Sequence, residues 1–248
     1  YKGYKNRLRT WETISGIKVL RDVTYMAENK GTIKRTIDYI SFAISSFFNS
    51  LAISKPDVVY STSPHIFAPL GAIAFSLVKR VPHVLEVRDL WPESIAATTG
   101  MSRSSVAYRC FEFIERLLYN SSKKIVVFTE SFKKNLILKG VLADKIHVVI
   151  NGANIALFEA PVYDEDLAIL LDLHNEFVVG YMGTHGLSHD LLNAVYAANL
   201  VKDDGIFFLF VGEGADKAAM ITLAKELNAT NIRFVGRQPR EDIPKYWG

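Results

Sequence analysis

Two glycines and two histidines stand close together in the segment Gly183–Asp190, which reads GTHGLSHD. An apolar run typical of a strand precedes this segment, and a run typical of a helix follows it. Glycine lets the backbone approach a ligand closely, and a helix N-terminus offers N–H groups with partial positive charge. The pattern therefore suits a pyrophosphate, with Thr184 and His185 as donors to its oxygens and Ser188 as the helix cap. A plain turn between a strand and a helix is the alternative.

Two further glycine segments occupy the same position after the next two expected strands. They are Gly212–Glu213–Gly214 and Gly236–Arg237. The carboxyl ends of parallel strands meet at one edge of a sheet, where the ligands of open α/β sheets bind. We therefore expect the three loops to converge into one binding site.

Metal ligation is the less favoured interpretation of the histidines and of one acidic run. His185 and His189 are four residues apart, as zinc ligands on a helix would be, but Gly186 places His185 in a loop. The run Asp164–Glu165–Asp166 contains D-x-D, yet it lies in an expected linker and is interpreted as a solvated charge run. No metal site is predicted.

A charged segment in the first half follows another expected strand. Residues 86–93 read EVRDLWPE and run from this strand into a loop. Such side chains at a strand's carboxyl edge are costly to bury without partners, which favours the lip of a site formed by Arg88, Asp89 and Glu93. The alternative is a surface ion pair between Arg88 and Asp89, with Trp91 packed beneath it.

Alternating strand and helix patterns position the charged segment. In the first half we expect strands at Val58–Ser61, His83–Val87, Lys124–Thr129 and Ile146–Ile150, and helices at Ile66–Lys79, Ser104–Asn120 and Phe132–Lys139. Ser131 would cap the last of these helices, and Ser63 would cap the first. One face of the middle helix carries Val106, Cys110, Phe113 and Leu117. Continuously apolar strands indicate a parallel sheet covered on both faces, which predicts a doubly wound α/β domain.

The ends of the first half are less regular. Residues 1–16 show no strand pattern, whereas Ile17–Thr24 is interpreted as an outlying strand. The apolar stretch Ile40–Ile53 is interpreted as a buried helix, because it is too short to cross a bilayer; a helix lying on a membrane is the alternative.

A second strand–helix series follows a linker at residues 153–176. We expect strands at Phe177–Gly183, Ile206–Gly212 and Ile232–Gly236, and helices at Asp190–Lys202, at Ala215–Leu227 and from Glu241 or Asp242 onward. The predicted domains are residues 1–160, in which the first strand–helix unit is missing, and residues 161–248. Both ends are expected to be cut short, because three strands make a poor self-standing domain of this type.

Composition and charge narrow the class of protein. With 49% hydrophobic residues and a single cysteine, Cys110, the chain is globular, lacks a disulfide framework and fits a cytoplasmic location. No signal peptide begins it. Residues 1–150 hold 22 Lys and Arg against 12 Asp and Glu, whereas residues 151–248 hold 7 against 14. The basic half would face anionic lipid at the inner plasma membrane, or a phosphorylated acceptor; a solvated basic surface is the alternative, and nucleic acid is not favoured.

Taken together, the motifs resemble glycosyltransferase family 4 of the two-domain GT-B fold. They are KPDVVYSTSP (55–64), PHVLEVRDLWPES (82–94), VVFTES (126–131), INGAN (150–154), YMGTHG (181–186), VGEG (211–214) and IRFVGR (232–237). They are most similar to bacterial O-antigen and capsule enzymes that resemble fucosamine transferases, and the RDLWPES run is the most specific of them. The expected fold is therefore α/β, with two Rossmann-like domains.

The resemblance implies a retaining, metal-independent transfer from a nucleotide-sugar, with a UDP-sugar as the donor and no tightly bound cofactor. Gly183–Gly186 would hold the diphosphate, Gly212–Gly214 and Arg237 would lie near the nucleoside, and Arg88, Asp89 and Glu93 would face a glycan or polyprenyl-linked acceptor. A GT-B-fold UDP-sugar 2-epimerase and a non-catalytic sugar-nucleotide-binding module are the alternatives.

Three departures from the family pattern stand out. Residues 183–195 contain no Arg or Lys to neutralise a diphosphate. The paired glutamates E-x7-E and the N-terminal glycine-rich loop are also absent from the chain. We therefore expect this chain alone to be inactive.

Overall fold

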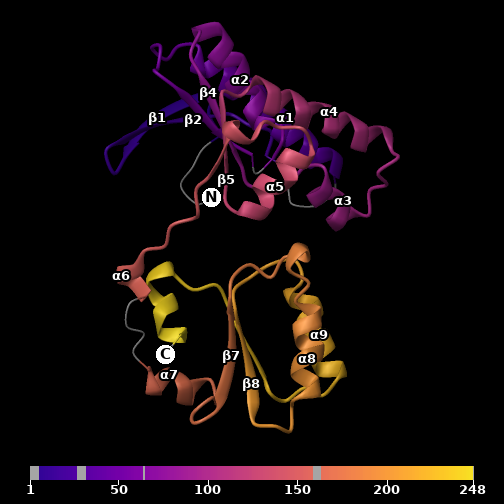
Figure 1. Ribbon diagram of the computed structural model, residues 1–248. Helices are drawn as coiled ribbons and strands as arrows, with labels where there is room; N and C mark the ends of the chain where they lie inside the picture. The colour runs from indigo at the N-terminus through magenta and orange to yellow at the C-terminus, as the bar shows by residue number, and fades with distance from the viewer. Residues whose placement is uncertain (1–5, 27–31, 64, 159–162, 248) are drawn as a thin grey trace. The chain divides into compact units, whose positions relative to one another are not determined.

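The computed structural model describes residues 6–26, 32–63, 65–158 and 163–247. The chain forms two compact units, Tyr1–Asn151 and Gly152–Gly248. The domain boundary at 160/161 that the sequence predicts lies outside the described residues. Figure 1 shows both units, each with a parallel sheet and its helices.

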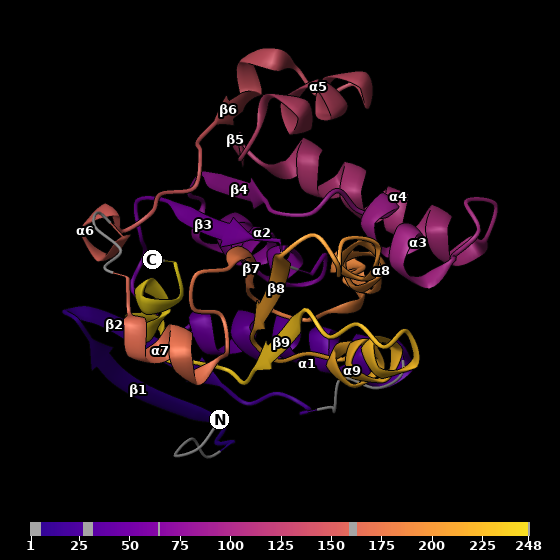
Figure 2. The same ribbon diagram turned by 90° about the horizontal axis from the view of Figure 1, so that it is seen from below.

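Unit 1 is built on a parallel four-stranded sheet in the order β3-β4-β5-β6, and Figure 2 shows these strands side by side. Leu85 and Val87 of β4 and Ile125 and Val127 of β5 form one buried cluster with Leu118 of α4. The elements of unit 1 are β1 (Arg9–Ile14), β2 (Ile17–Asp22), α1 (Thr32–Ser50), β3 (Val59–Thr62), α2 (Ala68–Lys79), β4 (His83–Val87), α3 (Glu93–Thr99), α4 (Val106–Ser121), β5 (Lys124–Val127), α5 (Glu130–Leu138), a 3-10 helix (Ala143–Lys145) and β6 (Ile146–Val148).

The expectation that residues 1–16 hold no strand is wrong. Strand β1 pairs antiparallel with β2, and Ile14 lies opposite Ile17. Ser15 and Gly16 join the two strands with φ angles of 49° and 82°. Positive φ at both central residues is the conformation that a two-residue hairpin turn requires, and glycine adopts it without strain.

Helix α1 is only half-buried, so the prediction of a buried helix at Ile40–Ile53 is also wrong. Ile44 is 53% exposed and Phe48 is 64% exposed. The inner side of α1 packs closely on α2, where a Cβ added to Gly71 would lie 2.6 Å from the backbone oxygen of Ala43. In the part of the chain that the structure describes, no helix combines the length and the apolar character that crossing a bilayer requires.

Helix α4 exposes the face that carries the regularly spaced apolar residues. Val106 is 78% exposed and Phe113 is 69% exposed, whereas Tyr108, Glu115 and Tyr119 are buried. Glu115 can be buried because it has hydrogen-bonding partners, described below. The shared face of Val106, Cys110, Phe113 and Leu117 therefore points outward.

Two helix caps in unit 1 differ from those expected. Thr129, not Ser131, caps α5, because its side chain accepts a hydrogen bond from the N–H of Phe132 at 3.2 Å. Helix α2 begins at Ala68, too far along the chain for Ser63 to cap it. The Ser63 hydroxyl instead accepts from the N–H of Arg88 at 3.4 Å.

A buried histidine ties the first residue of β4 to its neighbours. His83 is 2% exposed, its Nε2 lies 2.8 Å from Ser61 Oγ, and its Nδ1 lies 3.1 Å from Ser122 Oγ. Since Ser122 Oγ donates to the backbone oxygen of Leu118, it accepts from the Nδ1–H of His83. Burial lowers the pKa of His83 to about 4.

Unit 2 is built on a parallel three-stranded sheet in the order β7-β8-β9. Helices α8 and α9 cover one face and α7 lies on the other (Figures 1 and 2). The elements are α6 (Ile155–Phe158), α7 (Glu165–Leu170), β7 (Phe177–Met182), a 3-10 helix (Leu187–His189), α8 (Leu192–Leu200), β8 (Ile206–Val211), α9 (Lys217–Glu226), β9 (Ile232–Val235) and a 3-10 helix (Arg240–Tyr246).

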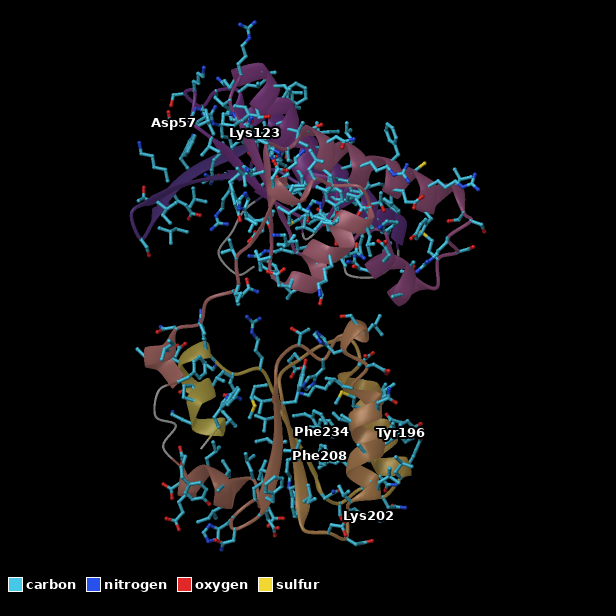
Figure 3. All side chains as sticks on the ribbon, in the orientation of Figure 1. Asp57, Lys123, Tyr196, Lys202, Phe208 and Phe234 are labelled. Atoms are coloured by element: carbon cyan, nitrogen blue, oxygen red, sulfur yellow. The ribbon has the colours of Figure 1, made fainter. Side chains whose placement is uncertain are left out.

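Aromatic side chains dominate the core beneath α8 and α9. Figure 3 shows Phe208 and Phe234 pointing from the sheet toward these helices. Phe210 stacks on both rings, with centroids 6.4 and 5.4 Å away. This packing holds β8 and β9 together immediately before the loops at their carboxyl ends.

Candidate functional site

The loop after β7 continues the strand pairing beyond the end of the sheet. The N–H of Gly183 donates to the backbone oxygen of Val211 at 2.9 Å. The Tyr181 hydroxyl donates to the backbone oxygen of Thr184 at 3.0 Å. The first glycine loop is therefore anchored from both the neighbouring strand and its own strand.

The second glycine loop encloses the backbone of the first. The N–H of His185 donates to the backbone oxygen of Glu213, and the N–H of Asp216 donates to the backbone oxygen of His185, both at 3.0 Å. A Cβ at Gly212 would lie 1.8 Å from the oxygen of Gly183, and one at Gly214 would lie 2.0 Å from the oxygen of His185. Glycine is therefore required at 212 and 214, because any other residue would separate the two loops.

The third loop joins the second through one charged pair. Lys217 Nζ donates to the backbone oxygens of Gly212 at 2.9 Å and of Val235 at 3.1 Å, and it pairs with Glu213 Oε1 at 2.7 Å. The Glu213 carboxylate also accepts from the backbone N–H of Arg237, and the hydrogen bond from Lys217 lowers its pKa. The loops that the sequence predicts to converge are thus hydrogen-bonded to one another.

The His185 ring lies inside this edge and not on its surface. The residue is 0% exposed, and neither ring nitrogen has a hydrogen-bond partner among the described residues. Its ring lies 5.9 Å from that of Tyr181 and 6.2 Å from that of Phe210. Burial, together with the charge of Lys217, lowers the pKa of His185, so the ring is neutral at pH 7.

Helix α8 begins later than expected and without the expected cap. Ser188 lies within the 3-10 helix Leu187–His189, and no side chain caps α8. The N–H of Asn193 donates to the backbone oxygen of Asp190, which has a positive φ of 49°. The helix N-terminus therefore offers fewer open N–H groups than the sequence pattern suggested.

The acidic run in the linker has a structural role. Asp164 caps α7, because its Oδ1 accepts from the N–H of Leu167 at 3.0 Å. Over the described ranges, no group of three His, Cys, Asp or Glu residues is close enough to hold a metal ion.

In unit 1, Arg88 and Asp89 follow β4 as expected, but they do not pair with each other. Arg88 Nε lies 3.1 Å from Glu86 Oε2, and the guanidinium lies 5.3 Å from the centre of the Phe128 ring. Glu86, Arg88 and Phe128 therefore lie together at the carboxyl ends of β4 and β5. Partial burial raises the pKa of the Asp89 carboxyl, which suits a group that accepts a hydrogen bond from a substrate hydroxyl.

Glu93 belongs to a partly buried charge network. Lys139 Nζ, at the end of α5, lies 2.8 Å from Glu93 Oε1 and 2.7 Å from Glu115 Oε1, and it donates to the backbone oxygen of Trp91 at 3.2 Å. The Tyr119 hydroxyl donates to the same Glu115 oxygen at 2.8 Å. Burial by itself lowers the pKa of Lys139. The hydrogen bonds and negative charges of Glu115 and Glu93 outweigh this effect, so the pKa of Lys139 is raised. The network anchors the loop that carries Asp89 to α4 and α5.

Sequence reasoning missed both lysines. Lys139 lies 46 residues from Glu93 in the chain, and no local pattern connects them. Lys217 lies four residues after Glu213, which is the spacing of a helical ion pair and was a usable signal. Trp91 does pack inward, with its ring centre 5.4 Å from that of Phe111.

Comparison with protein families places most of unit 1 in a known domain. Residues 32–152 match the family described as glycosyl transferase 4-like domain. The chain carries a glycosyl transferase 4-like domain. This domain runs from α1 past β6 and includes the segment with Arg88, Asp89 and Glu93. The resemblance to glycosyltransferase family 4 is thereby confirmed, while similarity to fucosamine transferases stays a prediction.

A curated relative extends the likeness beyond the glycosyl transferase 4-like domain. The Escherichia coli (strain K12) protein named as a colanic acid biosynthesis glycosyl transferase, WcaI, is 27% identical over 234 residues. The match covers 91% of this chain and 57% of WcaI. The chain thus spans little more than half the length of this relative.

Solved structures share the fold of both units. Anabaena Alr3699/HepE in complex with UDP-glucose has a TM-score of 0.60 at 16% identity, over 87% of this chain and 56% of that one. A UDP-N-acetylglucosamine 2-epimerase has a TM-score of 0.53 at 14% identity, over 91% of this chain and 56% of that one. The expected GT-B fold is confirmed, with a Rossmann-like unit on each side of Asn151.

Proposed function

We propose that the chain is part of a glycosyltransferase that moves a sugar from a nucleotide-sugar to a glycan or lipid-linked acceptor during cell-surface polysaccharide synthesis. One observation carries the proposal: three interlocked glycine loops lie at the carboxyl edge of a parallel sheet, in a chain that carries a glycosyl transferase 4-like domain. Ligands of α/β sheets bind at such an edge, and closely approached backbone N–H groups suit phosphate.

The proposed donor is a UDP-sugar. A structure of similar fold, Alr3699/HepE, was solved in complex with UDP-glucose. Thr184 and Gly186 would present backbone N–H groups to the diphosphate, because the N–H groups of Gly183 and His185 already donate to Val211 and Glu213. The loops at Gly212–Gly214 and Arg237 would lie nearer the nucleoside. The His185 ring is enclosed, so it would support the loop from below and would not be a surface ligand.

The proposed acceptor side is the loop after β4. A hydroxyl of the acceptor would form a bond to the anomeric carbon as the bond from that carbon to the diphosphate oxygen breaks, and its proton would leave with the departing phosphate. Asp89 would orient the hydroxyl by accepting a hydrogen bond from it. Arg88 and Glu93 are already paired with Glu86 and Lys139, so we propose that they fix the shape of this loop.

Finer features of the reaction follow from the family resemblance. We propose retention of the anomeric configuration, transfer of a hexosyl or N-acetylaminosugar group, and a reaction that needs no bound metal. Asp164 of the D-x-D run is used as a helix cap, which supports the last point.

A polyprenyl-linked acceptor at the inner face of the plasma membrane fits the charge of unit 1. Residues 1–150 carry an excess of ten positive charges. On α4 the outward stripe that contains Val106 and Phe113 lies beside Arg109 and Arg116, which are exposed. An apolar stripe flanked by arginines suits peripheral contact with anionic lipid.

The fold is shared with a 2-epimerase, so fold does not decide the reaction. The family match and the name of WcaI favour transfer. The test uses the whole protein with UDP-sugars, with and without a lipid-linked acceptor. We expect UDP release only when the acceptor is present, and a loss of about 10²-fold or more in Asp89→Asn. Sugar interconversion without acceptor would instead establish an epimerase, and binding without turnover would establish a non-catalytic module.

A further inference from the structure

We infer that Lys217 and Glu213 are positioning residues of the proposed nucleotide-sugar site, which fix the spacing of the loops after β8 and β9. The inference rests on the proposed function for its ligand, because the loops are taken to bind a nucleoside diphosphate. It assigns a task to a lysine that lies outside the glycine motifs. It also gives Glu213 a role different from direct contact with the nucleoside.

The contacts of Lys217 show that it acts on the loops themselves. Its ammonium group has three protons, and three acceptors surround it: the backbone oxygens of Gly212 and Val235, and Glu213 Oε1. The Lys217 side chain is 14% exposed. With every donor used inside the protein, Lys217 does not reach a ligand as a hydrogen-bond donor.

Gly212 and Val235 are the residues where two neighbouring strands give way to their loops. The carbonyl groups of both residues accept from Lys217 Nζ, so one partly buried cation bridges the ends of β8 and β9. Lys217 thereby fixes the distance between the second and third loops. The loop Gly212–Gly214 in turn encloses His185 of the first loop, so the position of Lys217 affects all three.

Glu213 completes this connection from the solvent side. Its side chain is 56% exposed, pairs with Lys217 and accepts from the backbone N–H of Arg237. Its backbone oxygen accepts from the N–H of His185. One residue therefore contacts the first loop through its backbone and the third loop through its side chain.

The Lys217–Glu213 pair also lies beside a first loop that has no basic residue of its own. Residues 183–195 hold no Lys or Arg, so the first loop has no cation of its own to offset a diphosphate. Besides burial, the charge of Lys217 lowers the pKa of the enclosed His185 ring, and the paired Glu213 carboxylate acts in the opposite sense.

The experiment is a titration of the chain with UDP, followed by NMR, on the natural sequence and on Lys217→Met, Glu213→Gln and the double variant. The matched control is Lys225→Met, which removes an exposed lysine from the same helix α9. The second readout is the ionisation of the His185 ring, assigned by its loss in His185→Gln. A merely structural lysine far from the loops would leave that ionisation unchanged.

We expect Lys217→Met to lower the affinity for UDP about tenfold, because a charged hydrogen-bond donor to two carbonyl groups is lost. It should also raise the pKa of His185 and shift the amide signals of Gly212, Gly236 and Arg237. Glu213→Gln should lower the affinity about threefold alone and add little in the Lys217→Met background. Lys225→Met should match the natural sequence in all readouts.

Unchanged UDP affinity and unchanged His185 ionisation in Lys217→Met would overturn the inference. Effects of the two substitutions that multiply fully would also overturn it, because they would indicate that Glu213 contacts the ligand independently. If Lys217→Met fails to fold, Glu213→Gln decides, since its side chain is exposed. If the natural sequence binds no UDP, the proposed function fails, and the amide and His185 signals still test the pair.

Discussion

Replacing Lys139 with methionine tests how the acceptor-side loop is held. Lys139 Nζ is bound to Glu115, Glu93 and the backbone oxygen of Trp91. Methionine keeps most of the side-chain volume and removes the charge. Among the described residues, Glu115, which is 4% exposed, then retains only the Tyr119 hydroxyl as a partner.

The expected loss of stability is about 3 kcal/mol. Removing one partner of a buried ion pair costs about 3–5 kcal/mol, because the other charge stays buried without compensation. The lower end applies here, since the side chains of Lys139 and Glu93 are 22% and 32% exposed and water can relieve part of the cost. Against a typical domain stability of about 5–15 kcal/mol, this is a large fraction.

The loss of stability in Lys139→Met should be smaller at lower pH. Burial raises the pKa of Glu115 above its value in the unfolded chain, and removing Lys139 raises it further. A carboxyl group with a raised pKa in the folded state binds a proton more readily in the folded chain than in the unfolded chain. At lower pH the group is therefore protonated, and no buried charge remains. The deficit of Lys139→Met should therefore shrink as pH falls from about 7 toward about 5.

The assay is urea unfolding followed by tryptophan fluorescence at both pH values, in a Trp247→Phe background so that the signal comes from unit 1. The matched control is Lys134→Met, which removes an exposed lysine from α5 and should change stability by less than about 0.5 kcal/mol. Combining Lys139→Met with Glu115→Leu should recover most of the loss, because an apolar pair replaces the ionic one. A deficit below about 1 kcal/mol, or one that is independent of pH, would refute the reasoning.

Three other outcomes follow from the structure. Gly212→Ala should destabilise unit 2 by about 2–3 kcal/mol and weaken UDP binding, because its Cβ would lie 1.8 Å from the Gly183 oxygen at a φ of 149°. Gly152→Ala, which meets nothing within 4 Å, should be neutral in the same thermal unfolding and UDP titrations. Because the pKa of His83 is lowered to about 4, the unfolded chain binds more protons between pH 4 and 6.5, so stability should fall on acidification by up to about 1.4 kcal/mol per pH unit. A His83→Gln variant that kept the same acid slope in urea unfolding would count against this assignment. Finally, unit 1 should carry the chain to anionic vesicles in a salt-sensitive way in a sedimentation assay, and binding that ignores salt would argue against a basic membrane-facing surface.

The parallel sheets and most of their helices were predictable, because buried parallel strands are apolar at nearly every residue. Strand β7 and strand β8 show this apolar pattern plainly. Strand β2 lies within the outlying strand expected at Ile17–Thr24, whereas β1 was missed because its sequence, RTWETI, is mostly polar. Ser15–Gly16 between them carries a recognisable turn signal.

The face that α4 buries could not be predicted from its own sequence pattern. Periodicity puts Phe113 in the core and Glu115 in water. Glu115 is buried because Lys139 and Tyr119 satisfy it, and Lys139 comes from another helix. A tertiary ion pair therefore outweighed the hydrophobic pattern.

The candidate site was located by its glycines, but the task of those glycines was not foreseen. Gly183 and Gly186 were expected to allow the approach of a ligand. The close approaches in the structure are instead made at Gly212 and Gly214, between one loop and the next. Which backbone passes beside a glycine depends on how neighbouring strands stack, and a single chain segment does not reveal it.

The most direct test of the central claim is a map of where UDP contacts the chain. In the NMR titration of the natural sequence, we predict that millimolar UDP shifts the backbone amides of Gly183–Gly186, Gly212–Gly214 and Gly236–Arg237. Shifts confined to other surfaces would contradict the account, for example at the cavity lined by Tyr163, Leu171 and Trp247 on the other side of unit 2. An unchanged spectrum would contradict it as well.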